Sequence, residues 1–232
     1  MKRILLKLSG EALAAGADGI YNHDFVDGVA ATVAGLSREG YEIALVIGAG
    51  NIWRGRSGGA MDRVDADRMG MLATVINSIC MKDAIIRAGV GSCVMTSVDM
   101  RPFAEIYSSD KARIALSGGQ VVVFAGGLGI PFLSTDTAGA VRAAEIQADA
   151  MFMAKNIDYI YTADPNVDKT AVKIERISAS EMLAKNLRAI DSTAAAFCMS
   201  NGMPIYIFGL KHPEDIASAV RDGKYGTVVT PD

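Results

Sequence analysis

The sequence predicts an α/β fold: a three-layer α/β/α sandwich whose central sheet is mostly parallel and carries helices on both faces. Short apolar runs of strand length alternate along the chain with segments in which apolar residues recur at helical spacing. Three of the predicted strands run directly into loops that contain glycine. The carboxyl ends of parallel strands share one crevice in such a sheet, so we expect these loops to surround one ligand site.

Composition excludes several classes of function. The 232 residues suit one large domain or two small ones, and a net charge of −3 without a polybasic run argues against nucleic-acid binding. Three scattered cysteines and two histidines indicate neither a disulfide framework nor a zinc site. The longest apolar runs are strand-sized and the N-terminus does not resemble a signal peptide, so we expect a cytoplasmic protein without membrane contact.

The first predicted strand, Arg3 to Leu8, contains a lysine that needs a partner. Burying an ammonium group alone is costly, so Lys7 is expected to emerge at the carboxyl end of the strand, beside Gly10, where an anion can pair with it. The alternative is a lysine on an edge strand that faces water. Asp24 is then expected to cap the helix that follows.

A second strand, Glu42 to Ile47, opens into a glycine loop with an arginine, Arg54, shortly beyond it. A planar guanidinium suits a phosphate, so this pattern predicts a phosphate contact, although an arginine on a mobile turn would give the same pattern. Residues 56–60 are polar and rich in glycine, which favours an entrance loop.

A long helix is expected from Asp65 or Asp67 to about Ala88. The aspartates near its start complement the helix dipole, so capping is their simplest interpretation. Apolar residues at helical spacing predict that one face of this helix packs in the core: Met69, Leu72, Ile76 and Ile79.

The clearest motif lies near the middle of the chain. A strand over Val121 to Phe124 runs into a loop with three glycines, and Ser134-Thr135-Asp136 begins a helix. Glycines let the backbone approach a ligand, and the free N–H groups at a helix N-terminus favour an anion such as phosphate. Taken alone, the motif is equally compatible with a plain strand-to-helix turn.

The C-terminal part continues the alternation. An aromatic and acidic turn over residues 155–165 suits either a wall for a nucleotide base and ribose or an ordinary surface turn. Asp191 is expected to cap a helix that runs to about Asn201, and Thr227 to Val229 to form an edge strand. The remaining predictions are strands over Ser92–Thr96, Ala150–Ala154 and Ile205–Phe208, and helices over Asp110–Leu116 and from Pro213.

Neither a Walker loop nor a dinucleotide fingerprint occurs, so the phosphate cradle is of another kind. Six blocks, spread over nearly the whole chain, resemble the bacterial UMP kinases of the amino acid kinase superfamily in order and spacing: KRILLKLSGEAL, GAGNIWRG, DADRMGMLATVIN, GIPFLSTD, YTADP and AIDSTAAAFC. The resemblance implies a single domain over residues 1–232 with the amino acid kinase fold, a homohexamer, and phosphoryl transfer from Mg²⁺-ATP to UMP. It also implies activation by GTP, bound between subunits near residues 15–20, and inhibition by UTP.

The resemblance further implies roles for individual residues. Lys7 would neutralise the transferring phosphoryl group, and Asp136 and Asp191 would orient this lysine and bind magnesium. Arg54 would grip phosphate on the ATP side, and Asp67 would take the ribose hydroxyls of UMP. The other implied UMP contacts are Ala49, Leu128, Gly129, Ile130, Pro131, Phe132, Leu133, Ser134 and Thr135. The other implied ATP contacts are Leu8, Ser9, Gly10, Gly50, Asn156, Tyr161 and Asp164.

The sequence departs from the family pattern in three places. Leu128 and Ile130 stand where many members carry Thr and Asn, so we hypothesise that uracil is recognised mainly by backbone groups. Ala49 replaces the middle glycine of its loop, which is a mild change where φ is negative. Tyr159 stands where glycine is usual and would narrow the adenine entrance.

Two other functions are compatible with the same scaffold. Another kinase of the superfamily would act on an amino acid, a carbamate or an isopentenyl phosphate, but Arg54 and Asp67 suit a nucleotide phosphate and ribose. A non-catalytic storage or effector-binding protein, such as the molybdenum storage proteins, would not require Lys7, Asp136 and Asp191 together.

Overall fold

The computed structural model describes residues 2–54, 59–165, 167–185, 187, 189–223 and 225–232. Its main strands are β1 (Arg3–Leu8), β2 (Glu42–Ile47), β3 (Ser92–Thr96), β4 (Glu105–Ile106), β5 (Val121–Ala125), β6 (Ala150–Lys155), β9 (Arg176–Ser178), β10 (Ile205–Gly209) and β11 (Thr227–Thr230). Two further strands, β7 (Ile160–Tyr161) and β8 (Lys173–Ile174), pair only with each other. The helices are α1 (Gly10–Ala14), α2 (His23–Arg38), α3 (Arg63–Arg87), α4 (Ser109–Ser117), α5 (Thr135–Glu145), α6 (Ala179–Ala184), α7 (Ser192–Ser200) and α8 (Asp215–Asp222).

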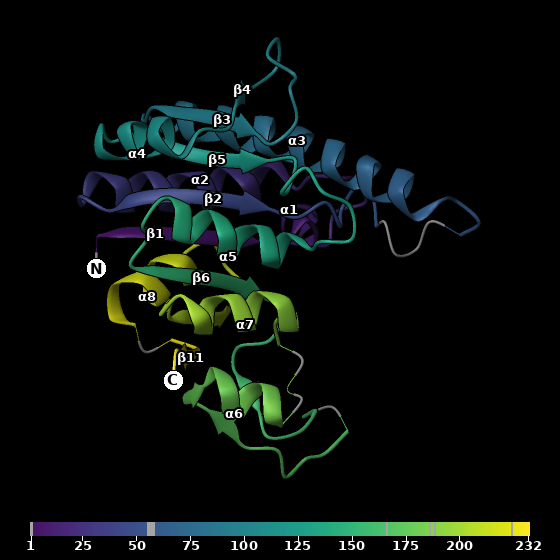
Figure 1. Ribbon diagram of the computed structural model, residues 1–232. Coiled ribbons are helices and arrows are strands. Elements are labelled where there is room, and N and C mark those ends of the chain that lie inside the picture. The colour runs from purple at the N-terminus through teal and green to yellow at the C-terminus, as the bar shows by residue number, and fades with distance from the viewer. Residues whose placement is uncertain (1, 55–58, 166, 186, 188, 224) are drawn as a thin grey trace.

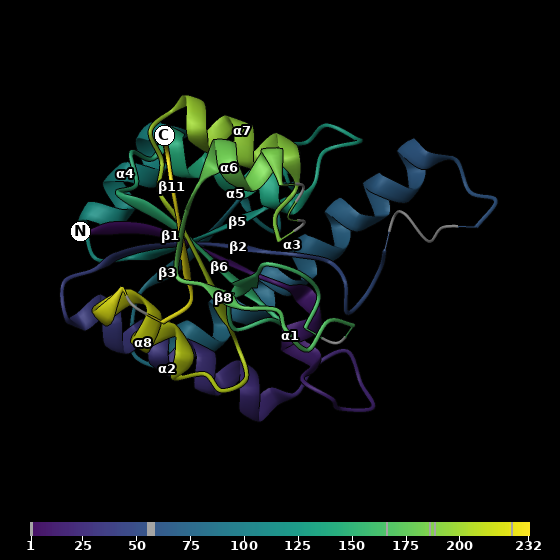
Figure 2. The same cartoon turned by 90° about the horizontal axis from the view of Figure 1, so that it is seen from below.

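The main strands form one sheet in the order β4-β3-β5-β2-β1-β6-β10-β11-β9. Neighbouring strands pair in parallel, except that β10 and β11 are antiparallel. Helices cover both faces of this sheet, which gives the three layers visible in Figures 1 and 2. The predicted α/β/α sandwich with a mostly parallel sheet is therefore confirmed.

Alternation of side chains along the strands creates two apolar layers. In β1, Ile4, Leu6 and Leu8 pack with α2, α3 and α8, whereas Leu5 packs on the opposite face with α4, α5 and α7. Lys7 has the same parity as Leu5 and therefore faces α5. Because β1 lies between β2 and β6, the alternative of an edge-strand lysine facing water is wrong.

Helix α3 differs from its prediction in both its start and its buried face. Its N-cap is Asp62, whose carboxylate accepts the N–H of Val64 at 2.9 Å. The residues predicted to pack in the core, Met69, Leu72, Ile76 and Ile79, are instead 36–54% exposed. The residues of α3 that are buried are a mixture of small, polar and apolar ones: Ala66, Ala73, Thr74, Val75, Asn77, Ser78, Met81, Ala84 and Ile85.

The physical reason is that α3 carries large apolar residues on its exposed side as well as on its buried side, where polar residues interrupt them, so helical periodicity cannot decide which side is buried. By length and composition alone this helix is apolar enough to cross a membrane. However, 44% of its apolar 18-residue stretch is buried inside the fold. Its packing against the sheet and α2 is that of a core helix. In Figure 1 its N-terminal turns project beyond the strand ends.

Two smaller predictions also need correction. The cap of α2 is Asn22, whose side chain accepts the N–H of Phe25 at 3.1 Å, and Asp24 lies within the first turn. Strand β11 is not at the edge, because β9 pairs outside it. The short helices α1 and α6 and the three-residue strand β9 were not predicted, because five or six residues are too few for a helical period and β9 has no apolar run. Residues 56–58 of the predicted entrance loop lie outside the described residues.

Candidate active site

The loops after β1 and β2 touch backbone to backbone at the carboxyl edge of the sheet. A Cβ atom added to Gly10 would lie 2.4 Å from the Gly48 carbonyl oxygen and 2.8 Å from the Gly50 nitrogen, so only glycine fits there. Asn77 of α3, which is fully buried, donates to the Gly48 carbonyl at 2.7 Å and so fixes the second loop from below. Two of the predicted phosphate loops are therefore one contiguous surface.

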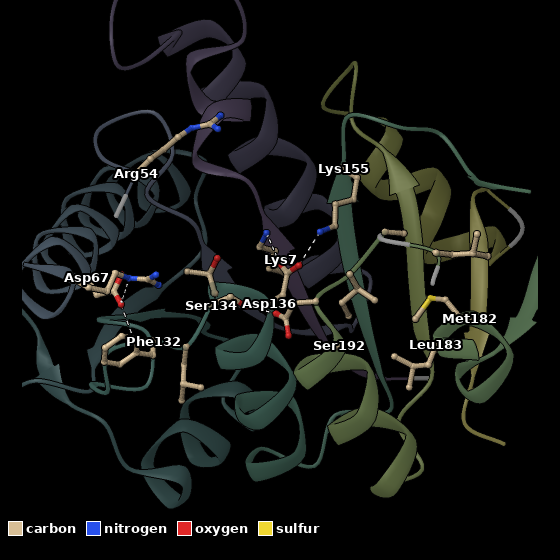
Figure 3. A pocket seen from close by; sticks show the side chains of 17 residues that line it. Lys7, Arg54, Asp67, Phe132, Ser134, Asp136, Lys155, Met182, Leu183 and Ser192 are labelled. Atoms are coloured by element: carbon tan, nitrogen blue, oxygen red, sulfur yellow. Dashed lines mark hydrogen bonds and ion pairs between the residues drawn. The ribbon is translucent and has the colours of Figure 1, made fainter. Parts of the chain in front are cut away.

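Two lysines share one carboxylate at the centre of this edge. Nζ of Lys7, at the end of β1, lies 2.6 Å from Oδ1 of Asp136, and Nζ of Lys155, at the end of β6, lies 2.9 Å from Oδ2. Figure 3 shows the three side chains converging from β1, β6 and the first turn of α5. Helix α5 can lie this close to the strands because Gly139 has no side chain, and a Cβ there would meet Met151 at 2.6 Å.

Burial and charge oppose each other in this group. Burial alone would raise the pKa of the Asp136 carboxyl, but the ammonium groups of Lys7 and Lys155 outweigh it and hold that pKa below its usual range. Burial lowers the pKa of Lys155, and Asp136 offsets this only in part. The aspartate is thus ionised at neutral pH, whereas Lys155 loses its charge at a lower pH than an exposed lysine does.

A second carboxylate joins the N-termini of α5 and α7. Asp191 caps α7 by accepting the N–H of Ala194 at 2.8 Å, as predicted. Its carboxylate also accepts hydrogen bonds from the hydroxyl of Ser134, the N-cap of α5, and from that of Thr137 at 3.1 Å. Both helix N-termini therefore direct their positive ends toward the same space as Lys7 and Lys155.

Residues 126–135, which we call the glycine loop, connect β5 to α5 and meet the start of α3. The Phe132 N–H donates to Oδ2 of Asp67 at 2.7 Å, and Nε of Arg63 donates to the same carboxylate at 2.9 Å. The Arg63 guanidinium also lies 5.4 Å from the Phe132 ring centre. These contacts hold Phe132 at a φ of 69°, a left-handed conformation that a non-glycine residue rarely adopts.

Two adjoining cavities lie above these groups. The large cavity has a volume of about 790 Å³, and its lining includes Lys7, Asp136, Lys155 and Asp191. An apolar wall also lines it: Met182, Leu183, Leu187, Ala189 and Ile190. Figure 3 shows Met182 and Leu183 of this wall on the opposite side of Asp136 from Asp67 and Phe132. The small cavity, about 210 Å³, shares five residues with the large one, so the two are continuous: Arg54, Asp67, Leu133, Ser134 and Thr135. Their combined size suits two nucleotide-sized ligands placed end to end.

Comparison with known proteins agrees with this geometry. Residues 2–209 match the family model described as "Amino acid kinase family". The chain belongs to the amino acid kinase family. Among solved structures it is similar to UMP kinase from Bacillus anthracis, with 32% identity over 100% of this chain and 96% of that one, at a TM-score of 0.94. It is also similar to UMP kinase from Ureaplasma parvum, with 31% identity over 99% of this chain and 98% of that one, at a TM-score of 0.94. Uridylate kinase from Archaeoglobus fulgidus shares 26% identity over 99% of this chain and 100% of that one, at a TM-score of 0.75. Within the family, the chain belongs with the UMP kinases.

The residues for which the family resemblance implied UMP contact mostly surround the small cavity. Seven of them line it: Ala49, Asp67, Leu128, Ile130, Leu133, Ser134 and Thr135. Phe132 lines the large cavity, whereas Gly129 and Pro131 face a separate apolar cavity beneath the glycine loop. Their roles as nucleotide ligands stay predictions.

The implied ATP contacts are less concentrated. Lys7 and Arg54 line the large cavity, Gly50 lines the small one, and Ser9 caps α1. Leu8 and Gly10 are buried in the sheet edge. Three residues after β6 do not line either cavity: Asn156, Tyr161 and Asp164. The Tyr161 hydroxyl, in β7, donates to Asp158 of the turn between β6 and β7 at 2.8 Å.

Sequence reasoning gave no role to Lys155, Arg63 or the apolar wall. Lys155 carried a usable signal, because it ends an apolar strand in the same way as Lys7 does. Arg63 lies one turn before Asp67, a spacing that indicates a helical ion pair. The apolar wall had no signal, since Met182 and Leu183 are ordinary apolar residues that only the tertiary fold brings to the cavity.

The residues present fit a magnesium ion that arrives with a nucleotide. Among the described residues, no group of three or more His, Cys, Asp or Glu side chains could hold a metal by itself. Mg²⁺ in kinases is held by one or two carboxylates together with phosphate oxygens and water. Asp136 and Asp191 line one cavity and meet that requirement.

Proposed function

We propose that this chain transfers the γ-phosphoryl group of Mg²⁺-ATP to UMP, giving UDP and ADP, in de novo pyrimidine nucleotide biosynthesis in the cytoplasm. One observation carries the proposal: Lys7 and Lys155 reach the same carboxylate of Asp136 at the floor of a cavity that continues past Asp67. Phosphoryl transfer requires in-line positioning and positive charge rather than covalent help from the protein. A phosphate oxygen of UMP is itself the nucleophile, so no histidine base is needed.

UMP is assigned to the small cavity. Asp67 is held in place by Arg63 and by the Phe132 N–H, and its carboxylate is suited to accept hydrogen bonds from the ribose hydroxyls. Thr135 and the N–H groups at the start of α5 provide donors for the UMP phosphate. Arg54 pairs with Glu11 and lines both cavities, so it can exchange that carboxylate for phosphate.

ATP is assigned to the large cavity. Lys7 and Lys155 lie where the transferring group would pass and can stabilise its negative charge, while Asp136 keeps the two ammonium groups in position. The apolar wall suits the face of a purine base. Magnesium, held by Asp136 and Asp191 with the phosphates, would supply further charge neutralisation. We retain Asn156, Tyr161 and Asp164 as proposed adenosine contacts that would require the turn after β6 to move.

The test is an ADP-release assay with Mg²⁺-ATP and UMP, CMP, dUMP, AMP or GMP as acceptor. We expect turnover on UMP and its loss by about 10³-fold or more in Lys7→Ala, because Lys7 contacts the reacting group. Lys111→Ala, which removes an exposed lysine of α4, is the matched control and should retain full activity. Turnover on none of the nucleotides would favour a binding protein instead.

We further propose that the chain assembles as a homohexamer that GTP activates and UTP inhibits. The exposed apolar stripe of α3, formed by Met69, Leu72, Ile76, Ile79 and Ile86, supports contact with a second copy of the chain. Sedimentation equilibrium tests the mass of the assembly, and a monomer at micromolar concentration would contradict it. A UMP phosphorylation rate that stays flat during GTP and UTP titrations would remove the regulatory part.

A further inference from the structure

Arg142 is a buried cation without a place in the reaction proposed above. It lies in the third turn of α5, is 6% exposed, and its guanidinium is 3.6 Å from the ring centre of Tyr107. Glu145, one turn further along α5, accepts a hydrogen bond from Nη1 of Arg142, and the Tyr107 hydroxyl donates to the same Glu145 oxygen at 2.7 Å. A buried guanidinium with this many partners has one orientation, and its remaining donors point in a fixed direction.

The remaining donors of Arg142 point toward the glycine loop and reach it through the hydroxyl of Ser97. Nη2 of Arg142 donates to the Ser97 hydroxyl oxygen at 2.7 Å, and this hydroxyl lies 2.7 Å from the Gly127 carbonyl oxygen. A serine hydroxyl has a single proton, and arginine only donates. Because Arg142 occupies a lone pair of the Ser97 oxygen, the hydroxyl proton is free to point at Gly127, and the two hydrogen bonds reinforce each other.

The glycine loop needs such a contact because its own sequence gives it little rigidity. Gly126, Gly127 and Gly129 have φ values of 73°, 58° and 75°, in the left-handed region that glycine reaches at no steric cost, and each loses much conformational freedom when ordered. Apart from the Ser97 contact, the Gly126 N–H donates to the Thr74 hydroxyl at 2.9 Å, and the Gly129 N–H to the Gly126 carbonyl at 2.9 Å. The Ser97 bond is thus the side-chain contact that fixes the middle of the turn.

We propose that Arg142 is a positioning residue for the acceptor nucleotide: acting through Ser97, it fixes the Gly127 carbonyl and so the part of the glycine loop that carries Leu128 and Ile130 into the small cavity. This inference rests on the proposed function in assigning that cavity to UMP. Arg142 itself touches neither cavity. Its effect should therefore fall on binding of the acceptor and spare ATP.

Steady-state kinetics of four variants test the proposal. Arg142→Met should raise KM for UMP by about 10-fold, because it removes charge-assisted hydrogen bonds, and should change KM for ATP by less than about 2-fold. Ser97→Ala should also raise KM for UMP, by a smaller factor than Arg142→Met does. The double variant should be no worse than Arg142→Met, because both changes break one relay. Tyr107→Phe keeps the ring beneath the guanidinium and is the control with unchanged KM values.

Equal rises in both KM values, or multiplying effects in the double variant, would overturn the relay and indicate a general structural role. Hydrogen–deuterium exchange of the segment 126–133, measured without any nucleotide, separates this proposal from the proposed function. Exchange there should be faster in Arg142→Met and Ser97→Ala and unchanged in Tyr107→Phe. Unchanged exchange in folded Arg142→Met and Ser97→Ala would refute the positioning role, whereas absence of UMP turnover in the unmodified protein would refute the function alone.

Discussion

The half of the site proposed to hold the acceptor, here called the acceptor half, and the half proposed to hold ATP, the donor half, are built differently. The acceptor half, around the small cavity, consists of strand-end loops and the start of α3, tied by hydrogen bonds among Asp67, Phe132, Thr74 and Gly126. The donor half, beyond Lys155, is an apolar wall with a short two-stranded sheet beside it. Figure 3 shows the two halves on opposite sides of Asp136.

The difference shows what each half can discriminate. Polar groups held in fixed positions reject a ligand that leaves them without a hydrogen bond, whereas an apolar wall discriminates mainly by size and shape. We therefore expect strict selection of the acceptor and looser selection of the donor base. Asp136 belongs to both halves, because it binds one lysine from each of two neighbouring strands.

Removing the shared carboxylate should have the largest effect. Asp136→Asn removes the carboxylate that pairs with both Lys7 and Lys155, and leaves their two ammonium groups close to each other. We expect a loss of about 3 kcal/mol in the free energy of unfolding, as for other buried pairs broken on one side. We also expect kcat to fall about 10³-fold, because Lys7 and Lys155 lose their common anchor. Urea unfolding and steady-state kinetics measure the two effects.

Asp110→Asn is the matched control for this change. Asp110 also lies in the first turn of a helix and also binds an arginine, Arg113, but its side chain is 78% exposed. Exposed ion pairs contribute little, so stability should change by less than about 1 kcal/mol. An Asp136→Asn protein with kcat within tenfold of the unmodified protein would remove Asp136 from the centre of the site.

A second, smaller effect should appear on the donor side as a pH dependence. The pKa of Lys155 is lowered chiefly by burial. Its positive charge is present below that pKa and is lost as the pH rises through it. This loss occurs at a lower pH than for an exposed lysine. kcat/KM for ATP should therefore decline on the alkaline side. In Lys155→Arg the decline should move to higher pH, because a guanidinium stays protonated.

Lys155→Met, which has no charge at any pH, should lower kcat/KM for ATP by about 10²-fold at neutral pH and lose the alkaline decline altogether. If kcat/KM for ATP depends on pH in the same way in Lys155→Arg as in the unmodified protein, a group other than Lys155 titrates. Either variant should leave KM for UMP nearly unchanged, since Lys155 does not line the small cavity.

The acceptor half was largely predictable from the sequence and the donor half was not, for a physical reason. Glycine loops at strand ends, such as residues 48–50 and 126–129, are local signals, and the parallel sheet brings them together without further information. Lys7, Asp136 and Asp191 likewise stand at strand or helix ends that the sequence predicts. The apolar wall comes from α6 and the segment after it, whose residues carry no distinguishing chemistry until the chain has folded.

Helix α3 illustrates the same limit within the fold. Its length was predictable from its composition, but large apolar residues on both its sides made the buried one undecidable from a single chain. Ala73 and Ala84 are buried because small residues let the helix approach the sheet, whereas the larger Leu72 and Ile76 remain at the surface. A choice between the two sides depends on what each one packs against, which is information outside the helix.

The smallest expected effect concerns base recognition in the acceptor half. Leu128 and Ile130 line the small cavity, and the nearby Thr74 hydroxyl already donates to the Met71 carbonyl at 2.6 Å and accepts the Gly126 N–H. This supports recognition of uracil mainly by backbone groups. Leu128→Thr adds a hydroxyl at the loop and should improve the preference for UMP over CMP in kcat/KM by about 5-fold, the value of one ordinary hydrogen bond.

Leu128→Ala is the control, because it opens the same space without adding a hydrogen-bonding group, and its UMP to CMP ratio should match that of the unmodified protein. If Leu128→Ala and Leu128→Thr change the ratio equally, the cavity selects by size and not by hydrogen bonding. If neither changes it, a side chain elsewhere in the small cavity reads the base. Only a ratio that rises with the hydroxyl alone agrees with an acceptor half that discriminates through positioned polar groups.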